Sequence, residues 1–478
     1  MISKKDLKKI SEYVWEIPRS FRSGMRVPAR IYITEKMLDE ILDEKAIEQL
    51  VNVATLPGVE RCALAMPDIH QGYGFPIGGV AAFRTEDGVI SPGGVGYDIN
   101  CGVRLLLSKY SYFEIKDKLP ELATGIQKSV PSGVGRGGKL ILGRRDFDEV
   151  LNMGVNWALK NGYAKKEDLE VLEESGCYAG ADASLVSDHA KKRGADQLGT
   201  IGSGNHFLEV QEVDEIYDEK IAKEFGLSVG QVTVMIHTGS RGLGHQVCTD
   251  YVRLMDRVIE NYNIHLPDRE LACAPFRSKE GREYFQAMAA AANFAWTNRQ
   301  VITHSIREVF KNLLKNGEKD ELDILYDVAH NIAKLEKHEG KEYIVHRKGA
   351  TRAFGPESPE LPGKYQKTGQ PVLIPGSMGT YSYVLAGTER SMTEAFGSSC
   401  HGAGRRISRV EAKRRISHER LKNELDKYGV VVRAGSKRGL VEEAPEAYKD
   451  VNDVVDVVSK SGLAKKVAKL KPLAVIKG

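Results

Sequence analysis

Hydrophobic positions along the chain recur with two spacings, one typical of helices and one typical of strands. The clearest helical spacing covers residues 35–51, where apolar side chains repeat at every third or fourth position. Further helices are expected over residues 3–14, 246–261, 282–314, 407–425 and 444–459, and over most of 145–195. Short apolar runs predict strands over residues 80–83, 103–107, 231–236, 343–346, 372–374 and 430–434. Helices and strands are therefore expected along the whole chain.

The composition adds to this picture. The chain has 478 residues, 41% of them hydrophobic, so it can bury a large core, and its 48 glycines imply many loops. Its net charge of +4 is small beside 69 basic and 65 acidic residues, so overall charge indicates no particular partner. The basic cluster over residues 405–415 is equally consistent with a phosphate-binding surface and with a solvated helix face.

Cysteine usage and the lack of targeting signals indicate a compartment. Six cysteines occur without paired spacing, and neither a signal peptide nor an apolar run of about 18 residues is present. We therefore expect a cytoplasmic protein with no membrane partner, whose cysteines are free thiols or metal ligands. Because the candidate site residues run from residue 68 to the C-terminus, we expect residues 1–478 to form a single catalytic domain.

A glycine-rich loop over residues 93–102 holds a carboxylate, Asp98, and a thiol, Cys101, three residues apart. Such a pair can bind one metal ion, because glycine lets the backbone approach a ligand closely. A thiolate can also bridge two ions, and paired ions are a recurrent device in phosphoryl chemistry. Each candidate histidine alone is more simply an ordinary residue, but the set together favours a metal centre. The histidines, all in small or amide-rich surroundings, are His206, His237 and His330. Mixed ligands suit zinc, iron, cobalt or manganese, and thiolate softness favours zinc.

His401 is the candidate nucleophile. It is followed by small residues and then by Arg405 and Arg406, and both backbone N–H groups and guanidiniums bind phosphate. The imidazole can form a phosphoramidate or act as a general acid or base, while Cys400 is either a rival nucleophile or a structural thiol. The loop 375–380 is either a phosphate or sugar site or a plain turn, and no Walker loop occurs. We keep as supporting or structural candidates His70, His245 and His346.

Six segments, taken in order, resemble the RtcB family of RNA-splicing ligases. They are residues 67–72, 96–102, 202–207, 237–241, 329–331 and 399–402. The resemblance covers essentially the full length, and the combination of Asp98, Cys101 and His401 is specific to that family. It implies a single α+β unit in which β-sheets are flanked by helices. It also implies an enzyme that joins RNA ending in a 2′,3′-cyclic phosphate or 3′-phosphate to RNA with a 5′-hydroxyl, using GTP and manganese.

The resemblance assigns the covalent chemistry to His401. This residue attacks GTP and becomes guanylylated, the guanylyl group moves to the RNA 3′-phosphate, and GMP leaves when the 5′-hydroxyl attacks. Asp68 orients the ring, as carboxylates do for other catalytic histidines. Two Mn²⁺ ions are implied, bridged by Cys101. His206 completes one site, and the other is completed by Asp98, His237 and His330.

The resemblance also implies a guanylate pocket and an RNA surface. Glu209 accepts hydrogen bonds from guanine that adenine cannot donate, which favours GTP over ATP, and Tyr448 stacks on the base. The implied pocket residues are Asn205, His206, Glu209, His330, Asn331, Pro375, Gly376, Ser377, Met378, Ser382, His401, Gly402, Ala403, Gly404, Tyr448 and Lys477. RNA phosphates are assigned to Arg241, Arg405 and Arg409. The implied partners are tRNA exon halves and a small archease-like activator, with the ligase itself a monomer.

Two other functions remain open from the sequence. A metal-dependent phosphoesterase that only opens cyclic phosphates would use the same metal ligands but would need no guanine pocket. An RNA-binding or chaperone protein would use the basic residues 405–415 and would be indifferent to the loss of Cys101. The match of six segments favours the ligase over both.

Overall fold

The computed structural model describes residues 2–133 and 136–478, and two large sheets organise it. The first sheet has seven strands in the order β1-β2-β3-β4-β5-β13-β12. Its central strands are buried along nearly their whole length, as their continuous apolar sequence requires. The strands are β1 (Lys8–Ser11), β2 (Val14–Ile17), β3 (Ala29–Tyr32), β4 (Ala63–His70), β5 (Ile77–Arg84), β12 (Asn331–His338) and β13 (Lys341–Lys348).

The second sheet has the order β11-β7-β9-β8-β19-β16-β15, and β18 pairs with β19 beside it. Its strands are β7 (Gly102–Ser111), β8 (Phe207–Ile216), β9 (Gln231–Thr238), β11 (Asp323–Ala329), β15 (Pro371–Ile374), β16 (Ser382–Gly387), β18 (Val431–Ala434) and β19 (Ala464–Lys477). Two short pairs complete the strands. They are β6 (Val89–Ile90) with β10 (Ala274–Pro275), and β14 (Ala350–Arg352) with β17 (Ser398–Cys400).

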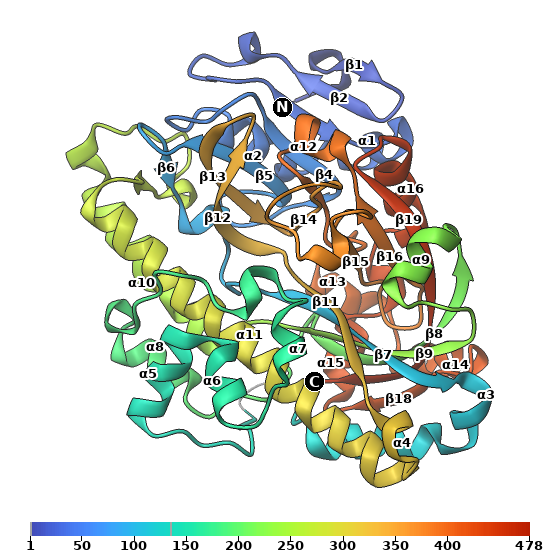
Figure 1. Cartoon of the computed structure of the whole chain (residues 1–478). Helices are drawn as coiled ribbons and strands as arrows, with labels where there is room; N and C mark the ends of the chain where they lie inside the picture. Colours follow the sequence, from blue (N-terminus) through green and yellow to red (C-terminus); the bar gives the residue numbers. More distant parts are fainter. Residues whose placement is uncertain (1, 134–135) are drawn as a thin grey trace.

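Helices flank these sheets, and the longest is α11 (Lys279–Leu314). Ser278 caps its start by accepting a hydrogen bond from the Gly281 N–H, and its alanine-rich middle is buried on all sides. Figure 1 shows α11 crossing the molecule beside α10 (Arg241–Val258), against the small helices α5 (Arg144–Met153) and α6 (Val155–Lys160). The other helices are α1 (Glu35–Ile41), α2 (Lys45–Val53), α3 (Tyr112–Ile115), α4 (Leu119–Ser129), α7 (Lys166–Leu169), α8 (Asp188–Gly194), α9 (Glu219–Phe225), α12 (Glu389–Ala395), α13 (Arg409–Arg415), α14 (His418–Lys427), α15 (Lys437–Glu442) and α16 (Val451–Lys460).

The expected α+β architecture is confirmed, and each expected strand is present. In the described part of the chain, no helix is both long and apolar enough to cross a lipid bilayer.

The expected helix over residues 3–14 is wrong. This segment forms one short turn and then β1 and the start of β2, because the β-branched and aromatic residues Val14, Trp15 and Ile17 pair with β3 and are buried.

Two other expected helices are each divided in the structure. The segment 35–51 contains α1 and α2, separated at Glu44, which has an extended backbone. The segment 407–425 contains α13 and α14, because Ser417 caps a new helix by accepting from the Arg420 N–H. The helix expected from residue 444 begins only at Val451, after a short turn that starts at Pro445.

Candidate active site

Strand register brings four distant segments to one end of the second sheet. His237 on β9 pairs with Val103 on β7 and with Phe207 on β8, while Ala329 on β11 pairs with Gly102 on β7. Cys101, His206 and His330 are the residues next to these paired positions, so they must lie close to His237. The sheet alone therefore assembles four of the five expected metal ligands.

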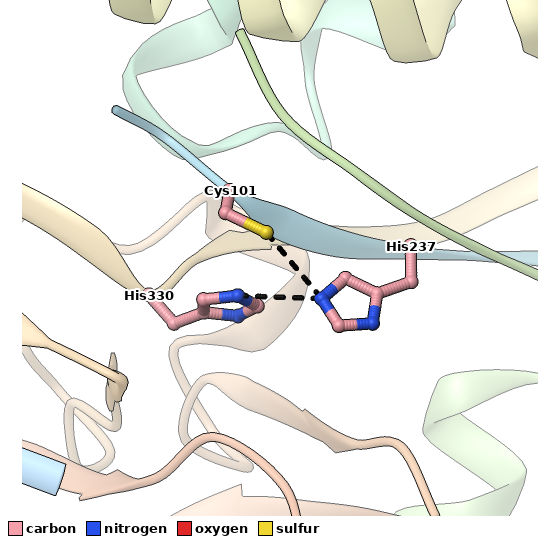
Figure 2. Close-up of side chains that lie close together, drawn as sticks. All are labelled: Cys101, His237 and His330. Atoms are coloured by element: carbon pink, nitrogen blue, oxygen red, sulfur yellow. Dashed lines mark hydrogen bonds between the residues drawn. The ribbon is translucent and has the colours of Figure 1, made fainter. Parts of the chain in front are cut away.

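Three of these side chains converge within the protein, and Figure 2 shows them pointing toward one another. The Cys101 Sγ lies 3.5 Å from Nε2 of His237, and that nitrogen lies 3.4 Å from Nε2 of His330. A metal with tetrahedral bonds to nitrogen and sulfur separates its ligand atoms by roughly 3.3–3.6 Å. The spacing of this trio therefore fits one shared cation.

A second trio shares the same thiol. The Cys101 Sγ lies 3.3 Å from Nε2 of His206, which lies 2.7 Å from a carboxylate oxygen of Asp98. The structure thus groups Asp98 with His206, which corrects the expected division in which Asp98 belonged with His237 and His330. All five expected ligands are brought together, and Cys101 is common to both trios.

The protonation states of these groups suit a metal. Burial lowers the pKa of both His237 and His330 well below the ordinary value, so both rings are neutral and can bind a cation. Burial also raises the pKa of the Cys101 thiol well above its ordinary value. Burial opposes ionisation of Asp98, but the neighbouring His206 outweighs it and lowers the carboxyl pKa to about 2. A cation between Cys101, His237 and His330 would therefore be met by two neutral imidazoles, and it would displace the thiol proton.

Asp68 on β4 holds His401, which follows β17. One oxygen of the buried Asp68 accepts from the His401 backbone N–H at 2.9 Å and lies 2.6 Å from its ring Nδ1. This contact places the proton on Nδ1 and leaves Nε2 with a free lone pair. The His401 ring centre lies 4.9 Å from that of His330, so the candidate nucleophile is next to the metal ligands.

The rival nucleophile, Cys400, is fully buried within β17. Burial raises the pKa of its thiol well above the ordinary value, which suppresses the reactive thiolate. Cys400 is therefore a structural thiol.

A cavity of about 180 Å³ opens beside His401. Most of the expected guanylate residues line it. They are Asn205, His330, Asn331, Pro375, Gly376, Ser377, Met378, His401, Gly402, Ala403, Gly404, Tyr448 and Lys477. Several further lining residues were not expected from the sequence, among them Phe207, Gly349 and Glu443. Phe207 directly follows the motif histidine His206, whereas Glu443 lies in a charged helical segment with no distinguishing pattern.

Glu209 and Ser382 do not line the cavity but lie just behind it. Gln211 donates to Glu209 at 2.8 Å and to Ser382 at 3.0 Å, and the Ser382 hydroxyl accepts from the Gly376 N–H at 3.1 Å. The other oxygen of Glu209 has no hydrogen-bond partner among the described residues. Burial raises the pKa of Glu209 to about 8. A buried acceptor of this kind is costly unless a ligand satisfies it.

The three expected RNA-binding arginines differ in their surroundings. A side chain built at Gly202 would lie 2.4 Å from a terminal nitrogen of Arg241 and also 2.4 Å from Nδ1 of His206. Arg241 therefore lies beside His206, one of the expected metal ligands. Arg409 lines the cavity, and its side chain is 51% exposed. Arg405 lines the same cavity, but its guanidinium is engaged by the protein itself and donates to Glu443, Tyr448 and two backbone carbonyls.

The three supporting histidines also differ in their surroundings. His70 lines the cavity, and its Nδ1 lies 2.8 Å from the Asp68 carbonyl oxygen. His346 is buried between Phe75 and Phe83, and its Nε2 accepts from the Ser91 N–H at 3.2 Å. His245 stacks on Tyr97 at a ring distance of 4.8 Å. His70 is thus the one of the three that lines the cavity.

Comparison with known proteins shows which family the chain belongs to. A sequence model of the family described as "tRNA-splicing ligase RtcB" matches residues 49–478. The chain belongs to the RtcB family. A relative from Archaeoglobus fulgidus is 55% identical over 477 residues, and one from Thermococcus kodakarensis is 56% identical over 477 residues, with 99% of each chain covered. A third, from Methanococcus maripaludis, is 54% identical over 480 residues, covering 99% of this chain and 100% of the relative. All three are named tRNA-splicing ligase RtcB.

Proposed function

We propose that this RtcB-family enzyme is a GTP-dependent RNA ligase that joins a 2′,3′-cyclic phosphate or 3′-phosphate end to a 5′-hydroxyl end, as in tRNA splicing. The observation that carries the proposal is the position of His401. Its ring is fixed by Asp68 at 2.6 Å, borders a cavity lined by small residues, and lies next to the ligand His330. A nucleophile, a cavity and a group of candidate metal ligands thus meet at one point.

His401 carries out the first step. Its Nε2 lone pair forms a bond to the α-phosphorus of GTP, and the bond from that phosphorus to the bridging oxygen breaks as pyrophosphate leaves. The ring gains positive charge in this step. The carboxylate of Asp68, which keeps the Nδ1 proton in place, stabilises that charge. The same charge makes the imidazole a good leaving group in the step that follows.

The second and third steps use the RNA ends. An oxygen of the RNA 3′-phosphate attacks the guanylyl phosphorus, and the bond to Nε2 of His401 breaks. The 5′-hydroxyl then attacks the activated 3′-phosphate and GMP leaves. A cyclic phosphate first takes up water to become a 3′-phosphate. Arg241 beside the metal ligands and Arg409 at the cavity are suited to hold the RNA phosphates.

The two trios that share Cys101 are suited to two cations, which we propose to be Mn²⁺ by analogy with the family. Such a pair of ions would neutralise charge on phosphate oxygens and orient the reacting groups. Asp98, Cys101 and His206 would hold one ion, and Cys101, His237 and His330 the other.

The guanine base is proposed to be read at the back of the cavity. The unpartnered oxygen of Glu209 can accept from the ring N–H and the exocyclic amine of guanine. Adenine offers no matching pair of donors, so it would leave this buried acceptor unpaired. Tyr448, at the cavity wall, is suited to stack on the base.

Labelling with GTP tests the proposal. The protein is incubated with Mn²⁺ and GTP labelled at the α-phosphate, and an acid-labile, alkali-stable adduct is expected on His401. His401→Ala should take up no label. The matched control is His70→Asn, because His70 lines the same cavity but has no proposed bond to phosphorus, so this variant should still take up label. Uptake of label by His401→Ala would overturn the proposal. Cyclic-phosphate opening without any joined product would favour the phosphoesterase.

We further propose that the enzyme acts on tRNA exon halves in the cytoplasm, as a monomer forming one catalytic domain over residues 1–478, and with an archease-like activator. These expectations come from the family. Light scattering would measure the mass in solution, and turnover with and without the activator would test that partnership.

A further inference from the structure

A buried guanidinium lies beneath the metal ligands. Arg299 on α11 and Asp327 on β11 are both fully buried. The guanidinium binds both carboxylate oxygens of Asp327, with Nε donating at 2.8 Å and Nη2 at 2.7 Å. This bidentate pairing fixes the plane and direction of the group.

The other edge of the same guanidinium faces the ligand-bearing backbone. Nη1 of Arg299 donates to the carbonyl oxygens of Asn100 and Thr238, each at 2.9 Å. Asn100 directly precedes Cys101, and Thr238 directly follows His237. One nitrogen therefore joins two chain segments, each of which carries a ligand of the same trio.

Further contacts tighten this arrangement. Nη2 of Arg299 donates to the side-chain oxygen of Asn100 at 3.0 Å, and the Asn100 amide donates back to the Ala292 carbonyl of the same helix at 2.8 Å. A side chain built at Gly102 would lie 3.2 Å from the guanidinium and 2.3 Å from the Val328 carbonyl oxygen. The glycine that follows Cys101 is thus required mainly by the close approach of the Val328 carbonyl, and Arg299 packs tightly against the same glycine.

The third ligand is tied to the same group. The His330 N–H donates to the Cys101 carbonyl at 2.9 Å, and Asp327 lies on the strand that leads into His330. We propose that Arg299, held by Asp327, is a positioning residue that fixes the spacing of the trio Cys101, His237 and His330 for its cation. This inference rests on the proposed function, because it assumes that the trio binds a metal.

Arg104 provides a matched control for the test. It is also fully buried and donates to Asp327 through Nε at 2.8 Å, but its remaining contacts are to the side chains of Gln300 and Thr303. Arg104→Lys and Arg299→Lys each replace one guanidinium beside Asp327 and keep its charge. Arg299→Lys cannot hold Asp327 and the two carbonyls at the same time, because lysine lacks the planar fork, whereas Arg104→Lys leaves those carbonyl contacts in place.

The experiment titrates the full-length protein with Co²⁺ alone and records the thiolate-to-cobalt absorption and the affinity. Replacing a group that supports metal ligands typically weakens binding about 10- to 100-fold, and we expect this loss, with a changed absorption band, for Arg299→Lys. Arg104→Lys should bind within about threefold of the parent, well below that range of losses. Circular dichroism and melting of both variants monitor folding.

Parent-like affinity and absorption in Arg299→Lys would overturn this inference alone, as would an equal loss in both arginine variants. A parent protein that binds no Co²⁺ would overturn the proposed function and this inference with it. If Arg299→Lys does not fold, the variant Asn100→Gly tests the inference instead. Asn100 has a φ of 51°, which glycine adopts without strain, so this variant should fold. Its loss of Co²⁺ affinity should exceed that of Arg104→Lys, and an unchanged affinity would overturn the inference.

Discussion

Replacing Asp68 by asparagine tests the link between the carboxylate and His401. One oxygen of Asp68 receives both the backbone N–H of His401, at 2.9 Å, and its ring Nδ1, at 2.6 Å. The other oxygen has no partner among the described residues. In the variant, the amide carbonyl should therefore face His401, because the reverse orientation would place an NH₂ group against two donors. The ring should keep its proton on Nδ1 and its lone pair on Nε2.

The expected loss of guanylylation rate follows from removing the negative charge of Asp68. A hydrogen bond to a charged partner contributes about 1.5–3 kcal/mol, against about 0.5–1.5 kcal/mol for a neutral one. The difference, about 1–1.5 kcal/mol, corresponds to about a tenfold slower guanylylation, since about 1.4 kcal/mol is a factor of ten in rate. An amide that selects the wrong imidazole tautomer slows the reaction far more, by about 10⁴-fold in kcat in a serine-protease triad.

Single-turnover labelling with GTP and Mn²⁺ measures this rate. Asp68→Ala is the companion variant and should be slower than Asp68→Asn, because it leaves the ring without any acceptor. Co²⁺ binding should match the parent in both, since Asp68 belongs to neither ligand trio. A parent-like rate in Asp68→Asn would refute the role of the charge. A loss near 10⁴-fold would refute the argument that fixes the tautomer.

Three further outcomes are expected. Because burial raises the pKa of Glu209 to about 8 and guanine needs the ionised acceptor, calorimetry should show GTP affinity rising with pH up to about 8, whereas Glu209→Gln should show no such dependence. Because burial holds the pKa of the Cys101 thiol well above its ordinary range, Co²⁺ binding should displace the thiol proton at neutral pH, detectable with a pH indicator, and Cys101→Ser should release about one proton fewer than the parent. In fluorescence anisotropy with RNA, Arg241→Ala should reduce the salt dependence by about one unit of slope. Arg405→Ala should leave that slope unchanged and raise the KM for GTP, because its guanidinium binds Glu443 and Tyr448 inside the protein.

The convergence of the candidate ligands and of His401 could be predicted from sequence because each residue carries a local signal. Cys101 lies in a glycine-rich loop, His237 ends a β-branched run, and His401 is followed by small residues. Strand ends are places where side chains meet, so these patterns also predicted that the segments converge. The strands themselves were predictable for the same reason, since apolar runs between turns leave few alternatives.

The division of ligands between the two trios could not be predicted in the same way. Whether Asp98 faces His206 or His237 depends on the path of the loop before β7, which no residue pattern encodes. The role of Arg299 could not be predicted either, because the sequence does not distinguish a buried arginine in a helix from a solvated one. The N-terminal hairpin was missed since its lysines and leucine resemble a basic helix, while its pairing with β3 depends on a distant contact.

The strand order has a consequence for how the protein is made. β19 lies between β8 and β16 and contributes Lys477 to the cavity wall, yet it is the last strand of its sheet to leave the ribosome. Until it emerges, two strand edges that will become interior are open to pairing with other chains. Before β19 emerges, a nascent chain can therefore complete neither this sheet nor the cavity beside His401. Shielding of those edges, by a chaperone or by slow release, would protect newly made protein from aggregation.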